Sequence, residues 1–193
     1  IAVIGDVMLD KFVWGRVSRI SPEAPVPVIK VAEETCHLGG ASNVASNLQT
    51  LGAKPLLVGV VGSDGTGQNL RSVLAAQNVA DTHLLEDKSR RTTVKTRIIA
   101  HGQQVVRADW ESTTALSEAS QARVLEQSRK VLGQAKVIVL SDYGKGALTP
   151  LVIEQIIALA EARKIPVLVD PKLRNYTHFR KVHLVTPNLL EAE

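Results

Sequence analysis

The sequence predicts an α/β fold with a mostly parallel sheet, helices on both faces and a small separate antiparallel layer. Short apolar runs typical of buried strands alternate with helical stretches over most of the chain. Polar residues follow those runs, where the carboxyl ends of parallel strands bind ligands. Two pairs of segments, within residues 9–36 and 92–109, instead alternate apolar with polar residues and have no helix between them.

The composition is that of a single globular domain with a substantial hydrophobic core. The chain has 193 residues, of which 45% are hydrophobic, and this excludes a disordered segment. The formal charge of +4 suits an anionic small molecule, whereas an aromatic content of 3% and the lack of a long Lys/Arg run argue against nucleic acid. No apolar run approaches the roughly 18 residues of a membrane span. Cys36 is the single cysteine, so we expect no internal disulfide and a cytoplasmic protein.

The chain begins with an apolar run at residues 1–4, which is followed by Gly5 and Asp6. This is the pattern of a buried parallel strand that delivers an acid at its carboxyl end, although Asp6 could equally cap a turn. Residues 9–15 and 26–31 then alternate as half-exposed strands do. The second such pair occupies residues 93–99 and 104–109.

A glycine pair, Gly39 and Gly40, precedes the first predicted helix. Glycines permit left-handed backbone and bring bare N–H groups close to a bound molecule, but they also serve simple chain reversal. Asn43 falls in the first helical turn, where unpaired N–H groups and the helix dipole favour polar or anionic ligands. Gly52 lies at the expected C-cap. The buried stripe of this helix is predicted at Val44, Leu48 and Leu51.

Strands and helices alternate in the rest of the chain. Further buried strands are predicted at residues 54–61, 136–140, 165–169 and 182–185. A loop at residues 62–67 leads into a helix that ends near Gln77. Ser117 is a plausible N-cap for a helix that ends near Leu132 and turns Val124 and Val131 inward, and Thr149 and Pro150 open another helix.

Polar side chains follow several of the predicted strands. Because the carboxyl ends of parallel strands meet at one edge of a sheet, these side chains are expected to converge on one rim. One such residue is ordinary loop solvation, but six at one edge favour a binding site. The six are Asp6, Asp142, Lys145, Asp170, Lys172 and Asn188.

The spacing of the glycines adds a family resemblance. Residues 39–45, GGASNVA, followed by Gly52 and Gly62, resemble the N-terminal signature of the ribokinase-like (PfkB) sugar kinases. Residues 188–191, NLLE, resemble the Asn-x-x-Glu motif of the same superfamily, although an Asn N-cap with Glu in the first turn gives the same tetrapeptide. The resemblance implies a ribokinase-like fold in which the antiparallel layer is a lid over the sugar.

Longer segments narrow the resemblance to the bacterial D-glycero-β-D-manno-heptose-7-phosphate kinases. The segments are residues 5–10, 18–28, 103–109, 141–146 and 170–172. That family transfers phosphate from ATP, with Mg²⁺, to the anomeric O1 of the sugar and gives the 1,7-bisphosphate for ADP-heptose and lipopolysaccharide synthesis. Two alternatives remain open: a kinase of the same superfamily for another sugar or a nucleoside, and a non-catalytic sugar-phosphate-binding or scaffolding protein.

The resemblance implies site roles and a partner. Arg107 on the lid and Lys172 on the rim are expected to meet the substrate phosphate by charge. Asn188 and Glu191 are expected to organise Mg²⁺-ATP, with Glu191 reaching the metal through water. The implied assembly is a homodimer paired through the lid. The residues expected around the sugar are Asp6, Asp10, Gly39, Gly40, Asn43, Asp142 and Lys145.

One part of the family pattern does not occur in residues 1–193. Ribokinase-like kinases carry a downstream Gly-Ala-Gly-Asp signature, whose amides form an anion hole and whose Asp deprotonates the acceptor hydroxyl. No catalytic residue is therefore assigned in this chain. We expect residues 1–193 to form an incomplete kinase domain that lacks the C-terminal ATP-binding and catalytic part and is inactive alone. Ile1 in place of Met also leads us to expect that residues precede it.

Overall fold

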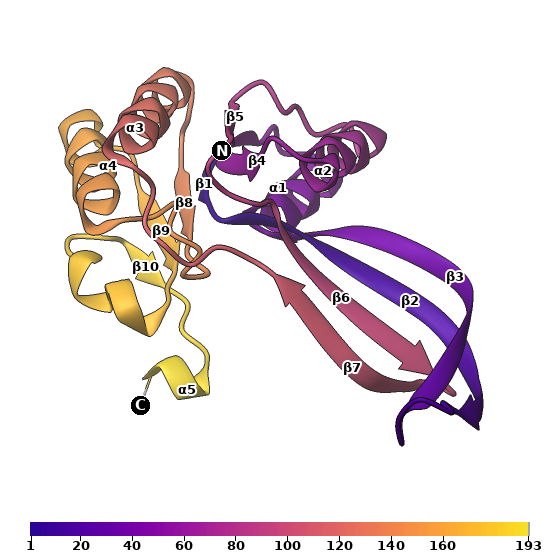
Figure 1. The fold of residues 1–193 in the computed structure, drawn as a ribbon. Helices are drawn as coiled ribbons and strands as arrows, with labels where there is room; N and C mark the ends of the chain where they lie inside the picture. The colour runs from indigo at the N-terminus through magenta and orange to yellow at the C-terminus, as the bar shows by residue number, and fades with distance from the viewer. Residues whose placement is uncertain (193) are drawn as a thin grey trace.

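The computed structural model describes residues 1–192 and contains a six-stranded sheet from which a four-stranded sheet projects (Figure 1). The main sheet has the order β10-β9-β8-β1-β4-β5, and its neighbouring strands pair in parallel. The predicted parallel sheet is thus confirmed. Its strands are β1 (Ala2–Gly5), β4 (Leu56–Gly62), β5 (Leu84–Asp87), β8 (Ile138–Ser141), β9 (Val167–Asp170) and β10 (Leu184–Val185).

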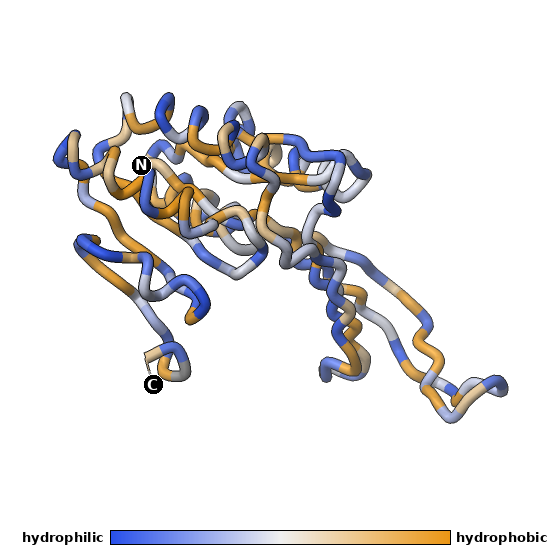
Figure 2. Tube along the Cα trace, turned by 60° about the vertical axis from the view of Figure 1, so that its left-hand side comes forward, coloured by the Kyte–Doolittle hydropathy of each residue, from blue (hydrophilic) through white to orange (hydrophobic). Residues whose placement is uncertain are grey.

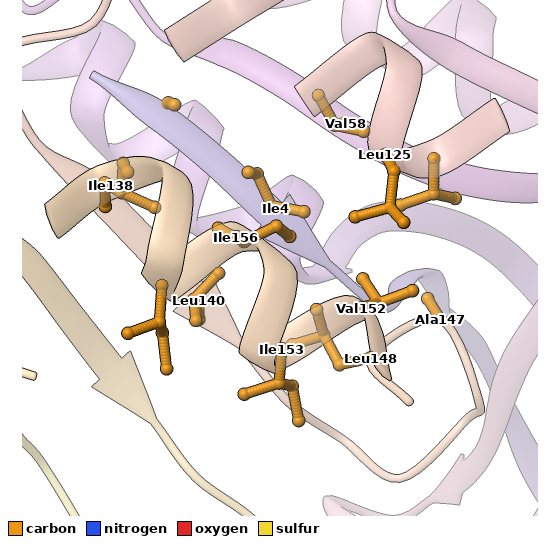
Figure 3. Packing of buried hydrophobic residues seen from close by; sticks show 14 of the residues in the cluster. Ile4, Val58, Leu125, Ile138, Leu140, Ala147, Leu148, Val152, Ile153 and Ile156 are labelled. Carbon is orange, nitrogen blue, oxygen red and sulfur yellow. The ribbon is translucent and has the colours of Figure 1, made fainter. Parts of the chain in front are cut away.

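Successive side chains of the central strands point to opposite faces of this sheet and contribute to two hydrophobic cores, one on each face. Val3 and Leu57 pack with the helices of one face, whereas Ile4 and Val58 pack with those of the other. The first face carries α1 (Ala41–Thr50) and α2 (Gly65–Ala76), and the second carries α3 (Glu118–Leu132) and α4 (Pro150–Arg163). Figure 3 shows Ile153 and Ile156 of α4 in the same cluster as Ile4 and Leu140 of the sheet. A 3₁₀ helix, η1 (Leu173–His178), and the short α5 (Leu189–Ala192) complete the chain.

The predicted helix caps are confirmed on the second face. Ser117 accepts a hydrogen bond from the Ser120 N–H at 3.2 Å, and Thr149 accepts one from the Val152 N–H at 3.3 Å. Pro150 occupies the first turn of α4, where its missing N–H costs nothing. These local signals explain why the observed helix starts on this face agree with the predicted ones.

The predicted buried stripe of α1 is wrong at one position. Leu51 is 82% exposed, because α1 ends at Thr50 and Leu51 is already its C-cap. Gly52 follows with a φ of +82°, and its N–H donates to Gln49 O at 3.0 Å, as expected for a glycine just past a helix end. The fully buried positions of the helix are the small residues Ala41, Ser42 and Ala45.

The four-stranded sheet, here called the lid, forms the predicted separate layer. Its order is β3-β2-β6-β7, and the strands are β2 (Val7–Ile20), β3 (Pro27–Gly40), β6 (Thr93–Ala100) and β7 (Gln103–Trp110). Figure 2 shows polar and apolar residues interspersed along these strands. The β2–β3 and β6–β7 pairs are antiparallel, as expected, but β2 and β6 pair in parallel. The lid is therefore mixed rather than purely antiparallel, because both strands leave the main sheet in the same direction (Figure 1).

Irregular pairing interrupts the lid halfway along its length. The register of β2 against β3 shifts between Trp14 and Gly15, and that of β6 against β7 shifts between Ile98 and Ile99. Trp14 and Ile99 are direct partners in the β2–β6 ladder, so the two irregularities lie side by side. Among the described residues, no helix has the length and apolar character needed to cross a membrane.

Candidate active site at the base of the lid

The lid joins the main sheet with almost no linker. Only Asp6 separates β1 from β2, and α1 begins at Ala41, directly after β3 ends at Gly40. The Ala41 N–H donates to Asp6 O at 2.9 Å, which ties the two junctions together. Consequently the start of β2, the glycine pair and the first turn of α1 meet at the carboxyl end of β1.

The glycine pair is required by close approach of β2. A Cβ on Gly39 would lie 2.5 Å from the Asp10 Oδ2, and a Cβ on Gly40 would lie 2.4 Å from the Asp6 carbonyl oxygen. Gly40 also has a φ of +56°, in the left-handed region. The structure therefore brings together Asp10 and both glycines, three of the residues that the family resemblance placed around the sugar.

Gly40→Ala is expected to destabilise the fold by about 3 kcal/mol, because it combines left-handed strain with a backbone clash. Gly102 supplies a matched control, since its φ is +77° but nothing lies within 4 Å of a Cβ placed there. Gly102→Ala should therefore cost only about 1 kcal/mol. Urea unfolding of the two variants measures the difference, and equal costs would contradict the clash.

Asn43 is exposed in the first turn of α1, beside the glycine pair. Gly40 is the N-cap of this helix and supplies no side-chain hydrogen bond. The Ala41 N–H is bonded to Asp6 O, but no side chain of the N-cap residue caps the N–H groups that follow it in the first turn. These lie next to the exposed Asn43 amide, which suits hydroxyl or anion binding.

Asp6 does not face a ligand in this structure. Its side chain is 3% exposed, and its carboxylate accepts the N–H groups of Tyr143 at 2.9 Å, Lys145 at 3.0 Å and Ala147 at 3.0 Å. The prediction that Asp6 binds sugar hydroxyls is therefore corrected: Asp6 holds the loop of residues 142–149 in place.

Asp142 supports the same loop from inside. It is 2% exposed, and its carboxylate accepts the Gly144 N–H at 2.8 Å and the Asn175 side-chain amide at 2.9 Å. Burial raises the pKa of Asp142, and the nearby charge of Asp6 adds to the effect. Direct sugar contact through Asp142, which the sequence predicted, does not fit these contacts.

The other predicted rim residues gather around the start of α5. Burial raises the pKa of Asp170, and the charge of Glu191 raises it further. Lys172 forms an ion pair with Glu191, and this hydrogen bond lowers the pKa of Glu191. Asn188 and Glu191 cap each other, because each accepts the other's backbone N–H at 3.0 Å. The alternative reading of the motif, an N-cap with Glu in the first turn, thus describes the local contacts.

A row of ion pairs runs from the lid to the rim loop. Lys145 lies 2.7 Å from Glu111, which follows β7, and Lys95 lies 3.3 Å from Asp109 and 3.9 Å from Glu111. Arg107 binds Asp109 through two nitrogens, at 2.9 and 3.0 Å. The predicted phosphate ligands Arg107 and Lys172 accordingly each have a carboxylate partner of their own.

The model of the pfkB family carbohydrate kinases matches residues 1–193. The chain belongs to the pfkB carbohydrate kinase family. Among curated relatives it is 48% identical to bifunctional protein HldE of Wolinella succinogenes, over 100% of this chain and 41% of the relative. HldE of Caulobacter sp. strain K31 is 47% identical over 100% of this chain and 39% of the relative. The chain thus spans about two fifths of the length of these relatives, and the predicted family resemblance is confirmed.

Solved structures show that the pfkB chain has the ribokinase-like fold. Escherichia coli phosphofructokinase-2 in complex with substrates and products superposes with a TM-score of 0.75 at 22% identity, over 98% of this chain and 60% of that one. Its tetrameric inhibited form gives a TM-score of 0.72, also at 22% identity, over 98% and 61%. At this identity the likeness concerns the fold, lid included.

Sequence reasoning missed one charged residue that contacts Asp10 in this pfkB chain. Arg97 of β6 forms an ion pair with Asp10 of β2, and its guanidinium lies 5.3 Å from the centre of the Phe12 ring. With His37, these side chains line an open cavity of about 420 Å³. The alternation of β6 could have indicated that Arg97 shares a face with Lys95, but not that this face meets Asp10.

A second cavity, of about 720 Å³, lies on the opposite face of the lid. It contains Lys11, the strand neighbour of Asp10, together with Asn69 of α2, so it is separate from the predicted sugar residues. Within residues 1–192 there is no group of three or more His, Cys, Asp or Glu side chains arranged to hold a metal.

Proposed function

We propose that the protein containing this chain transfers phosphate from ATP to the anomeric O1 of D-glycero-β-D-manno-heptose 7-phosphate. It would act in the cytoplasm, on the route to ADP-heptose and the lipopolysaccharide core. The observation that carries the proposal is the meeting of Asp10, the glycine pair and the first turn of α1 at the lid base, in a chain 48% identical to a bifunctional HldE.

Each proposed role follows from the chemistry of the group. The Asp10 carboxylate accepts hydrogen bonds from sugar hydroxyls, while the N–H groups beside Gly39 and Gly40 and the Asn43 amide supply donors and a further acceptor. Asp6 and Asp142 act indirectly, because they fix the loop that carries Lys145. This division keeps five of the predicted sugar-site residues and gives the two buried acids a supporting role.

Arg107 and Lys172 are the cations proposed for the 7-phosphate. Their side chains are 47% and 41% exposed, so each is free to exchange its carboxylate partner for a phosphate oxygen. Arginine suits this role because its planar guanidinium binds two oxygens of a phosphate at once. Lid closure would then bring Arg107 over the sugar and exclude water that would otherwise hydrolyse ATP.

Asn188 and Glu191 are proposed to organise Mg²⁺-ATP at the rim. Carboxylate and amide oxygens are the ligands that Mg²⁺ prefers, and the ion keeps several of its waters when bound. Among the described residues, each Glu191 oxygen accepts one hydrogen bond, which leaves a lone pair for a metal-bound water. Bound Mg²⁺ would neutralise charge on the triphosphate, while the protein groups align the reactants.

A substrate screen tests the proposal. The full-length protein is assayed for ADP release with Mg²⁺-ATP and heptose 7-phosphate, ribose, fructose 6-phosphate or adenosine. The highest kcat/KM is expected for heptose 7-phosphate. A preference for another acceptor would favour a different kinase of the superfamily, and binding without turnover for any of them would favour a sugar-phosphate-binding protein.

We also propose that residues 1–193 hold the sugar-binding parts of the kinase domain and not its general base. Transfer to a hydroxyl needs a carboxylate near the proton that leaves, and the buried acids Asp6 and Asp142 are engaged with backbone groups. Residues 1–193 alone are expected to release no ADP under conditions in which the full-length protein does. Turnover by the shorter chain would place a base within it.

The lid is proposed to pair two subunits. Its strands expose large apolar side chains, including Trp14 (40%), Val31 (49%) and Val106 (49%), which a second lid would cover. Val106→Asp is therefore expected to convert a dimer into a monomer in light-scattering chromatography. Leu151→Asp is the matched control, because Leu151 of α4 is similarly exposed (52%) but lies outside the lid. Equal masses for all three proteins would contradict pairing through the lid.

A further inference from the structure

The two oxygens of the Asp10 carboxylate have different surroundings. One oxygen, Oδ1, accepts a hydrogen bond from the Arg97 guanidinium of the neighbouring parallel strand. The other oxygen, Oδ2, lies beside Gly39. A Cβ at position 39 would be only 2.5 Å from it, so any larger residue there would displace this oxygen. Both side chains of the pair are 24% exposed, which shields the pair from much of the solvent. Asp10 thus has one oxygen engaged by Arg97 and one beside Gly39.

Arg97 is itself fixed by an aromatic group. Its guanidinium lies 5.3 Å from the centre of the Phe12 ring, within the range of a cation–π contact. The Phe12 ring is stacked on Trp14 at 6.0 Å and meets His37 edge-on at 5.5 Å. These contacts restrict the long Arg97 side chain, so the direction of its hydrogen bond to Asp10 is set before any ligand arrives.

We propose that Arg97 is a positioning residue of the sugar site, which fixes Asp10 so that Oδ2 is presented to substrate hydroxyls across Gly39. The inference rests on the proposed function, since it assumes that Asp10 binds the sugar. An unrestrained carboxylate rotates about its last bond and must be ordered at binding, whereas the Arg97 hydrogen bond removes that freedom in advance. Lys95 is the register partner of Asp10 in β6 but pairs with Asp109 and Glu111, whereas Arg97 forms the ion pair with Asp10.

Direct binding of the substrate phosphate by Arg97 is a different role with a different signature. A phosphate ligand would discriminate between the 7-phosphate and the free heptose, so its loss would reduce the ratio of their kcat/KM values. A positioning residue acts on the hydroxyl end, which both sugars share. Its loss therefore lowers kcat/KM for both sugars by the same factor and leaves the KM for ATP unchanged.

The test is a double-mutant cycle in the full-length protein. Arg97→Ala is expected to lower kcat/KM for the sugar by about 10-fold to 100-fold, with Arg97→Lys recovering part of the loss because it keeps the charge without the planar fork. Asp10→Asn removes the group that Arg97 acts on, so the double variant Asp10→Asn/Arg97→Ala should be little worse than Asp10→Asn alone. Arg129→Ala on the exposed face of α3 is the control for loss of one arginine and should keep wild-type kinetics.

The outcomes separate the inference from the proposed function. Losses that multiply in the double variant, or a fall in the ratio between phosphorylated and free sugar, would overturn the positioning role. A rise in the KM for ATP as large as the rise in the KM for the sugar, together with a lower Tm for both Arg97 variants, would mean that Arg97 supports general stability. That outcome would also overturn the positioning role. If Arg97→Ala is silent while Asp10→Asn is impaired, the inference alone fails. If Asp10→Asn is silent, the sugar-site assignment fails as well.

Discussion

Asp10→Asn in the full-length protein is expected to reduce kcat/KM for the sugar by about 100-fold, the largest kinetic effect among residues 1–192. The carboxylate lies at the base of the lid beside the glycine pair, and hydrogen bonds to a charged acceptor are each worth about 1.5–3 kcal/mol. Asn keeps the shape of the side chain but presents a weaker acceptor and an amide that repels the Arg97 donors.

Steady-state kinetics with varied sugar at saturating Mg²⁺-ATP measures this effect. Glu34→Gln is the matched control, because Glu34 is also a lid carboxylate paired with a cation, Lys11 at 2.7 Å, but lies on the opposite face. It should leave the kinetics unchanged. A comparable loss in the Glu34 variant would show that the effect comes from lid charge in general and not from sugar contact.

Asp6→Ala is expected to have the largest effect on stability, a loss of roughly 3 to 5 kcal/mol. The change leaves the buried N–H group of Ala147 and the partly buried N–H groups of Tyr143 and Lys145 without their acceptor, and each buried unsatisfied donor costs about 1–3 kcal/mol. Since small domains are stable by only about 5–15 kcal/mol, this variant should unfold at much lower urea concentration.

The control for Asp6→Ala is Asp81→Ala. Asp81 pairs with Arg71 at 2.6 Å, but its side chain is 44% exposed, so its loss should cost less than about 1 kcal/mol. Hydrogen exchange gives a second readout, because the amides of the loop at residues 142–149 should lose protection in the Asp6 variant first. A small stability loss with unchanged protection would mean that solvent replaces the carboxylate without penalty.

Local sequence signals predicted most of the fold and named the residues that meet at the base of the lid. Strand runs, the Ser117 and Thr149 caps and the glycine pair all depend on neighbours within a few residues, so one sequence suffices to place them. The acid at the end of β1 shows the limit. A carboxylate after a strand either faces a ligand or binds a loop, and the deciding contacts of Asp6 are made with N–H groups 137 to 141 positions away.

The same limit applies to the lid. Alternating residues identify a half-exposed strand but not the direction of its partner, so the parallel pairing of β2 with β6 was not predictable from pattern alone. The Asp10–Arg97 pair joins residues 87 positions apart across that ladder. Without the ladder register, Arg97 is indistinguishable from the other lid cations, and sequence reasoning named Arg107 and not Arg97.

The paired irregularities at Trp14 and Ile99 give the lid an uneven stiffness. Bulged strands bend and twist more than regular ones, and here the interruptions lie next to each other in adjacent strands. The lid is therefore expected to bend most easily along a line that crosses it about halfway along its length. Asp10 and Arg97 lie on the inner side of that line, where the ladder is regular and joins the main sheet without a linker. A force on the outer half, whether from a second subunit or from thermal motion, would bend the lid at this line before it displaced the Asp10 carboxylate.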